Sequence, residues 1–250
     1  MQQKEKKTKQ THHLKITTMK RIILIISLIS LAVMSANAQY HGKYPRAYLE
    51  GYRYQPRHSY QDRFYARWNH PYVGLRIGPS FTTVHSDDPY LDGSNMKAGL
   101  NVGIATGFPL SSYVPLYLET GLYYTEKGGR GTVGGSHFKY NLDYLELPFV
   151  FKYKVNMSRS FSLQPYLGGY VGLGVAGRIK DFQEREAYSS FGNSDYSFRR
   201  GDAGIRLGCG IGYDMLYAEI NYDWGLVNIS HNSFDDCRNG ALTLTVGVNF

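Results

Sequence analysis

The last eleven residues, Gly240-Ala-Leu-Thr-Leu-Thr-Val-Gly-Val-Asn-Phe250, alternate between apolar residues and small or polar ones up to the final aromatic. Side chains two positions apart share one face of a strand. One face is therefore apolar and the other small or polar. This pattern is typical of the strand that closes a bacterial outer membrane barrel. We interpret the terminal Phe250 as a lipid-facing signal for the barrel-assembly machinery.

The N-terminal residues have the composition of a secretory signal peptide. Lys20 and Arg21 precede an apolar run over residues 22–33, and a small-x-small cleavage site follows at 36–38. The run is about a dozen residues, whereas a spanning helix needs about 20, so a permanent anchor is the weaker interpretation. We expect residues 1–38 to be removed, with Met19 as an alternative translation start.

The formal charge of +8 comes mainly from this segment. Residues 1–38 contain seven Lys and Arg against the single acid Glu5, a contribution of +6, and the remainder has 21 basic and 19 acidic residues, or +2. The mature protein is thus nearly neutral, and the charge gives no support to nucleic-acid binding.

Eight alternating segments follow residue 70, each long enough for a tilted membrane strand. The connections between them are alternately long and short, as in outer membrane barrels with short periplasmic turns. The sequence predicts an all-β, eight-stranded antiparallel up-and-down barrel over residues 71–250, located in the bacterial outer membrane. The predicted strands are 71–81, 98–108, 115–126, 140–154, 161–176, 201–213, 216–225 and 240–250, and the predicted long polar loops are 82–97, 127–139, 177–200 and 226–239.

The side of the barrel wall that each side chain faces follows from the alternation within its strand. In 201–213, Ile205 and Leu207 alternate with Gly204, Arg206 and Gly208. Because charge and glycine lie opposite the apolar residues in several strands, we expect the apolar face to contact lipid.

The same parity places charges of both signs inside the barrel, where ions are stable only as pairs. An eight-stranded barrel is filled by its own side chains, so we expect a closed, salt-bridged lumen and not a pore. Catalytic carboxylates or an ion path are the functional alternative. The predicted charged set is Arg76, Glu119, Glu146, Lys152, Arg206, Glu219 and Asp223, accompanied by Tyr117, Tyr123, Tyr166 and Tyr170.

Aromatic residues mark the predicted periplasmic ends of the strands on the outward parity. Such residues form the interfacial girdle of membrane barrels. The predicted girdle is Phe108, Tyr153, Phe161, Tyr213 and Phe250.

Residues 39–70 are rich in Tyr and Arg and lack strand alternation. We expect a flexible periplasmic lead-in. The alternative is a helix on which Tyr40, Tyr44, Tyr48 and Tyr52 form one stripe. Such a stripe would lie on anionic headgroups or bind a periplasmic or secretion partner.

Three motifs resemble the PorT-like outer membrane beta-barrel family of Bacteroidota. They are residues 142–149 with Lys152, residues 201–213, and residues 222–229. The resemblance covers 71–250 and implies an OmpA/OmpX-like barrel. It implies nothing specific about activity, although the founding member is tied to type IX secretion.

Evidence for catalysis or metal binding is weak. The His231-Asn232-Ser233 triplet has the His-x-Ser spacing of an outer membrane lipid A deacylase, but no third group accompanies it. Acidic loop residues near His85 and Asp92 lack the spacing of a calcium loop. We expect no cofactor, and no disulfide between a lipid-facing Cys209 and a Cys237 placed in an external loop.

Two classes of function therefore lead. The first is a non-catalytic barrel that acts through its loops or through residues 39–70 in envelope structure or binding. The second is an accessory of protein secretion or envelope assembly. A lipid-modifying enzyme is the third.

Overall fold

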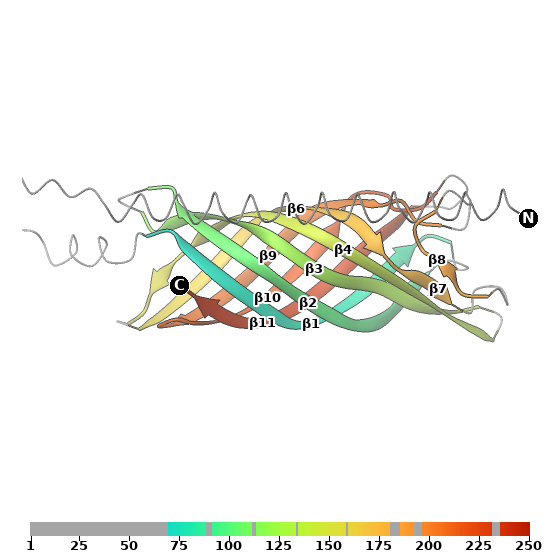
Figure 1. Cartoon of the computed structure of the whole chain (residues 1–250), viewed down its shortest axis with the longest axis horizontal. Coiled ribbons are helices and arrows are strands. Elements are labelled where there is room, and N and C mark those ends of the chain that lie inside the picture. The colour runs from blue at the N-terminus through green and yellow to red at the C-terminus, as the bar shows by residue number, and fades with distance from the viewer. Residues whose placement is uncertain are drawn as a thin grey trace, which may run out of the picture. The chain divides into compact units, whose positions relative to one another are not determined.

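The structure, a computed structural model, describes residues 70–88, 92–111, 114–133, 135–158, 160–180, 186–192, 197–231 and 236–250. Residues 1–69, with the expected signal peptide and Tyr/Arg-rich segment, lie outside this set. Eight long strands make up most of the described chain (Figure 1). They are β1 (Tyr72–Ser86), β2 (Gly93–Pro109), β3 (Leu116–Val133), β4 (Ser136–Tyr153), β6 (Phe161–Ala176), β9 (Gly201–Tyr213), β10 (Leu216–Gly225) and β11 (Cys237–Asn249).

These strands form a closed antiparallel barrel. Each pairs with the next along the chain, β4 pairs with β6, and β11 pairs back to β1. Three short strands lie at its ends: β5 (Val155–Asn156), β7 (Arg178–Lys180) and β8 (Tyr188–Ser189). The predicted eight-stranded up-and-down barrel is confirmed. We call the end with the C-terminus the turn end, and the end with β7 and β8 the loop end (Figure 1).

The two faces of the wall differ as the alternation predicts. On β1, Leu75 and Ile77 are 48% and 52% exposed on the outside, whereas Arg76 between them is 1% exposed inside. The same parity leaves aliphatic side chains exposed around the whole barrel, because lipid and not water is their expected surrounding. No helix in the described residues is long and apolar enough to cross a membrane.

The strands continue well past the boundaries that the apolar alternation indicated. β3 and β4 each have 18 residues and turn within a few residues of position 134, so most of the predicted 127–139 loop is strand. The predicted loops 82–97 and 177–200 also contain strand residues. The reason is that backbone pairing continues beyond the membrane, where the outward face no longer has to be apolar.

One predicted placement is wrong. Cys237 does not lie in an external loop: it is the first residue of β11, it pairs with Ser86 of β1, and its side chain is fully buried. Cys209 lines the outer, lipid-facing wall, as predicted, and both residues are present as thiols.

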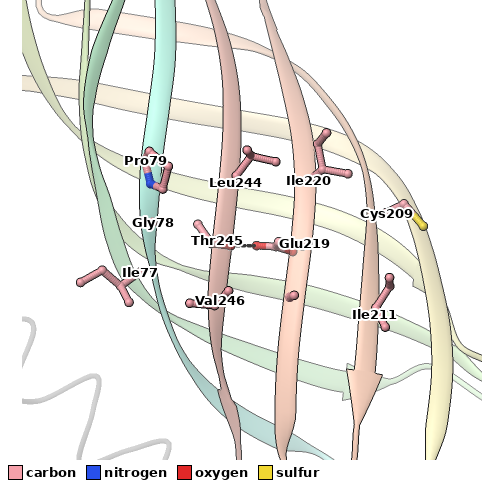
Figure 2. A pocket seen from close by; sticks show the side chains of 11 residues that line it. Ile77, Gly78, Pro79, Cys209, Ile211, Glu219, Ile220, Leu244, Thr245 and Val246 are labelled. Atoms are coloured by element: carbon pink, nitrogen blue, oxygen red, sulfur yellow. Dashed lines mark hydrogen bonds between the residues drawn. The ribbon is translucent and has the colours of Figure 1, made fainter.

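The joint between the first and last strands contains an interruption. Ile77 pairs with Val246 and Ser80 with Thr243, but Gly78 and Pro79 between them have no partner on β11. Proline has no N–H to donate to a ladder. An apolar hollow of about 480 Å³ lies on the outer face here, with Leu244 and Ile220 on its wall (Figure 2).

Candidate functional site

The lumen at the turn end contains a compact cluster of four charged residues, the turn-end cluster: Arg76, Glu119, Lys152 and Glu219. Lys152 Nζ lies 2.7 Å from Glu119 Oε2 and 4.0 Å from Glu219 Oε2. Arg76 stacks on the Tyr217 ring at 4.0 Å and donates from Nη2 to the Asn249 amide oxygen at 2.6 Å.

Tyrosine hydroxyls complete this cluster. Tyr166 and Tyr217 donate to Glu219 at 2.9 and 3.0 Å, and Tyr72 donates to Glu119. With two cations and two carboxylates the turn-end cluster is formally neutral.

A second cluster, the loop-end cluster, fills the lumen nearer the loops. It consists of Lys127, Glu146, Asp202, Arg206 and Asp223, all buried. Lys127 Nζ lies 2.6 Å from Glu146 Oε1 and 3.1 Å from Asp202 Oδ2. Arg206 bonds Asp223 with two nitrogens, at 2.6 and 2.7 Å, and reaches Glu146 at 2.9 Å.

The loop-end cluster combines two cations with three carboxylates, and hydrogen bonds from neutral donors stabilise the excess negative charge. Thr125 donates to Glu146 at 3.0 Å, and Asn239 donates to Asp202 at 3.0 Å. Charged groups removed from water are kept only where partners of opposite charge and hydrogen bonds replace their hydration. The carboxylates of both clusters have such partners, and the charged residues come from five wall strands, β1, β3, β4, β9 and β10.

Above the loop-end cluster the lumen becomes apolar. A group of buried side chains, the mouth cluster, closes the loop end. Phe191 and Phe198 come from the segment between β8 and β9, and they pack edge-on against Tyr144 and Tyr140 of β4. The full set is Val84, Phe138, Tyr140, Leu142, Tyr144, Ile179, Phe191, Phe198, Ile229 and Cys237.

All seven charged residues selected from the sequence lie inside the barrel, and the four tyrosines beside them are also buried. Two members of the network were missed. Lys127 falls in a segment assigned to a loop, and only the extension of β3 brings it inside. Asp202 has the same parity as Arg206 and could have been found by continuing the alternation to the start of β9.

The aromatic residues predicted for the girdle lie at the turn end. Phe161 pairs with Tyr213 across β6 and β9, and Phe250 forms backbone hydrogen bonds with Val73 beside it. Phe108, Tyr153, Tyr213 and Phe250 are exposed on the outside, and Phe161 is half-buried.

The other candidates from the sequence do not form a recognisable centre. His85 lies 3.6 Å from Asp92 at an exposed position. Among the described residues, no group of three or more His, Cys, Asp or Glu side chains is placed to hold a metal ion. Asn232 and Ser233 of the His-x-Ser triplet lie outside the described residues.

A closed eight-stranded barrel with an aliphatic outer belt and a charged, filled interior defines a transmembrane β-barrel of the outer membrane class. A comparison of the sequence with protein-family profiles agrees with this class. The profile of the outer membrane protein beta-barrel domain family matches residues 59–231, and the chain belongs to this family. It is a protein of the bacterial outer membrane. Because barrels of this class have short periplasmic turns and longer extracellular loops, we assign the turn end to the periplasm and the loop end to the outside.

Solved structures with a related chain trace include three outer membrane proteins. The attachment invasion locus protein Ail of Yersinia pestis is 15% identical, with 72% of this chain and 99% of that chain covered and a TM-score of 0.39. Neisserial surface protein A is 17% identical, with 72% and 97% covered and a TM-score of 0.41. A major outer membrane protein of Thermus thermophilus is 12% identical, with 72% and 100% covered and a TM-score of 0.44. No curated protein sequence matches the chain.

Proposed function

We propose that this protein is a non-catalytic outer membrane barrel with a closed lumen, which acts in envelope structure or binding through its extracellular loops or residues 39–70. The observation that carries the proposal is the filling of the lumen in successive layers. The two ionic clusters occupy the interior, and the mouth cluster covers them. A lumen filled in this way leaves contact with other molecules to the loops, the outer wall and the N-terminal segment.

Conductance of the purified full-length protein in a planar lipid bilayer tests the closed lumen. We expect no current steps under conditions in which a porin, reconstituted in parallel, gives stable ones. Stable steps from this protein would contradict the proposal. The variant Phe198→Gly would then show whether the current runs through the mouth.

A role as an accessory of type IX-like secretion or of envelope assembly is the second candidate, and the likeness to the PorT-like family supports it. The residues that carry this likeness have structural positions: Leu142 and Tyr144 belong to the mouth cluster and Glu146 to the loop-end cluster. The likeness therefore supports the barrel fold more directly than a role in secretion. Crosslinking in whole cells, with and without residues 39–70, tests the partner: a crosslinked envelope protein lost on deletion would favour this candidate over the first.

The C-terminal residue has a separate proposed role in assembly. Phe250 is exposed at the periplasmic end of β11, which suits recognition by the barrel-assembly machinery. Deleting Phe250 should lower the amount of heat-modifiable barrel in the outer membrane.

A lipid-modifying enzyme remains the third candidate, and loss of lipid A deacylation in a deletion strain would be its test.

A further inference from the structure

The outer wall of the barrel contains a polar cleft at the loop end, which we call the rim cleft. It has a volume of about 840 Å³ and lies over β2, β3, β4, β7 and β8. Its charged lining residues are Lys97, Glu126, Lys139, Asp143, Arg178 and Lys180. None of these belongs to the ionic clusters of the lumen, so the cleft is independent of the function proposed above.

The strand geometry places three of these side chains, Lys139, Arg178 and Lys180, outside the barrel. In β7, Ile179 is buried in the mouth cluster, so Arg178 and Lys180 on either side of it point outward and are exposed. β7 pairs with β4 such that Lys180 lies opposite Lys139. Three cations are thereby gathered on one outward surface.

The acidic residues of the rim cleft already have partners. The Asp143 carboxylate accepts a hydrogen bond from the Tyr124 hydroxyl, and Glu126 accepts one from the Leu100 backbone N–H at 3.1 Å. In contrast, among the residues that the structure describes, Lys139, Arg178 and Lys180 make no ion pair. The neutral donors leave both carboxylates charged, so the three cations exceed the carboxylates of the cleft by one.

A further cation strengthens this excess. Lys97 is 4% exposed at the inner wall of the cleft, where its Nζ donates to the Lys127 carbonyl at 2.9 Å. Glu126 and Asp143 attract its charge, and Lys139 repels it less strongly. An anion bound beside Lys139 would lessen the repulsion between these two lysines.

The position along the membrane axis indicates the source of such an anion. On β4 the outward residues change from Leu147 and Leu145 to Asp143 and Lys139, and from the end of β6 to the start of β7 they change from Val175 to Arg178. The cleft thus begins where the aliphatic belt ends, at the level of the headgroups of the outer leaflet. A ligand with acyl chains on the belt and an anionic headgroup above them fits both surfaces.

We propose that the rim cleft binds the phosphorylated sugar headgroup of an outer-leaflet glycolipid, with Lys139, Arg178 and Lys180 as the phosphate-binding residues. Asn141 and the two carboxylates of the cleft offer hydrogen-bond acceptors and donors suited to sugar hydroxyls. The acyl chains lie along the belt between β4 and β6.

Native mass spectrometry of the full-length protein in detergent, titrated with bisphosphorylated lipid A, tests this proposal. The variant Lys139→Gln/Arg178→Gln removes two of the three proposed phosphate-binding cations. Since each basic residue near an anionic lipid surface contributes about fivefold in affinity, we expect binding to weaken roughly 25-fold. The matched control Arg199→Gln/Arg238→Gln removes the same charge from exposed positions outside the cleft and should bind like the unmodified protein.

Two further probes identify the source of the anion. Lipid A without its phosphates should bind no better to the unmodified protein than to the cleft variant, and inorganic phosphate at the same concentration should not displace lipid A. Equal binding of lipid A by both variants, tight binding of the dephosphorylated lipid, or displacement by phosphate would overturn the proposal. Heat-modifiability on a gel verifies folding of each variant. Should the double variant fail to fold, the single Arg178→Gln, with an expected fivefold loss, decides the question.

Discussion

The membrane half and the extracellular half of this barrel have opposite polarity, although the same strands build both. In the membrane half of β4, Glu146 points into the lumen and Leu147 points to lipid. In the extracellular half, Leu142 and Tyr144 point inward, and Asp143 points outward. Even-numbered residues face inward from Phe138 to Lys152, so the polarity inverts without a change of register. The difference teaches that the medium outside the wall, lipid or water, determines which face is apolar.

The largest effect should come from leaving a buried charge in the membrane half without its partner. Arg206→Met leaves Glu146 and Asp223 with only Lys127 to neutralise them. Removing one member of a buried pair costs about 3–5 kcal/mol. Lys152→Met in the smaller, neutral turn-end cluster should cost less. Urea unfolding of the reconstituted barrel, followed by the fluorescence of lipid-facing Trp224, measures both; an equal or reversed order would show that the two clusters are not distinct.

The two faces of β4 provide the next comparison. Leu142→Ala leaves a cavity in the mouth cluster and should lower the free energy of unfolding by about 3 kcal/mol. Leu147→Ala removes the same atoms from a side chain that contacts lipid, which can fill the space, so a loss of about 1 kcal/mol is expected. The same unfolding measurement distinguishes them. Similar losses at both positions would mean that the mouth is not packed as a core.

A milder change at the mouth should loosen the cover without unfolding the barrel. Phe198→Leu is expected to lower the free energy of unfolding by about 1 kcal/mol, since the leucine side chain keeps most of the contact with Tyr140. Cys237, buried in the same cluster, should then react several-fold faster with a water-soluble maleimide. Cys209, on the lipid face, gives the internal control, because its rate should not change. An unchanged rate at Cys237 would show that access does not depend on the mouth cluster.

The smallest effect is expected at the inverted outward face. Asp143→Asn keeps the shape and the hydrogen bond with Tyr124, and surface positions of this kind change stability by less than about 0.5 kcal/mol. A loss comparable to that of Leu142→Ala would mean that the outward face of the extracellular half is not in water.

The sequence predicted the membrane half well, because lipid imposes strict alternation there. Leu75, Arg76 and Ile77 could be assigned to their faces from parity alone. The extracellular half could not be predicted in the same way: around Lys127 and Phe198 the outer face is free to be polar, and the alternation that identifies strands is lost. The mouth cluster also brings together Phe191, Tyr144 and Ile229 from separate parts of the chain, which no local pattern contains.

The length of the β3–β4 hairpin has a consequence for access at the cell surface. The outward apolar residues of β3 end near Tyr124, and the strand continues to Val133. At about 3.3 Å per residue and a tilt of about 40°, the tip stands roughly 20 Å beyond the belt. A large macromolecule held away from the bilayer by surface sugars can reach this tip, whereas only small molecules and lipids can approach the wall at its base.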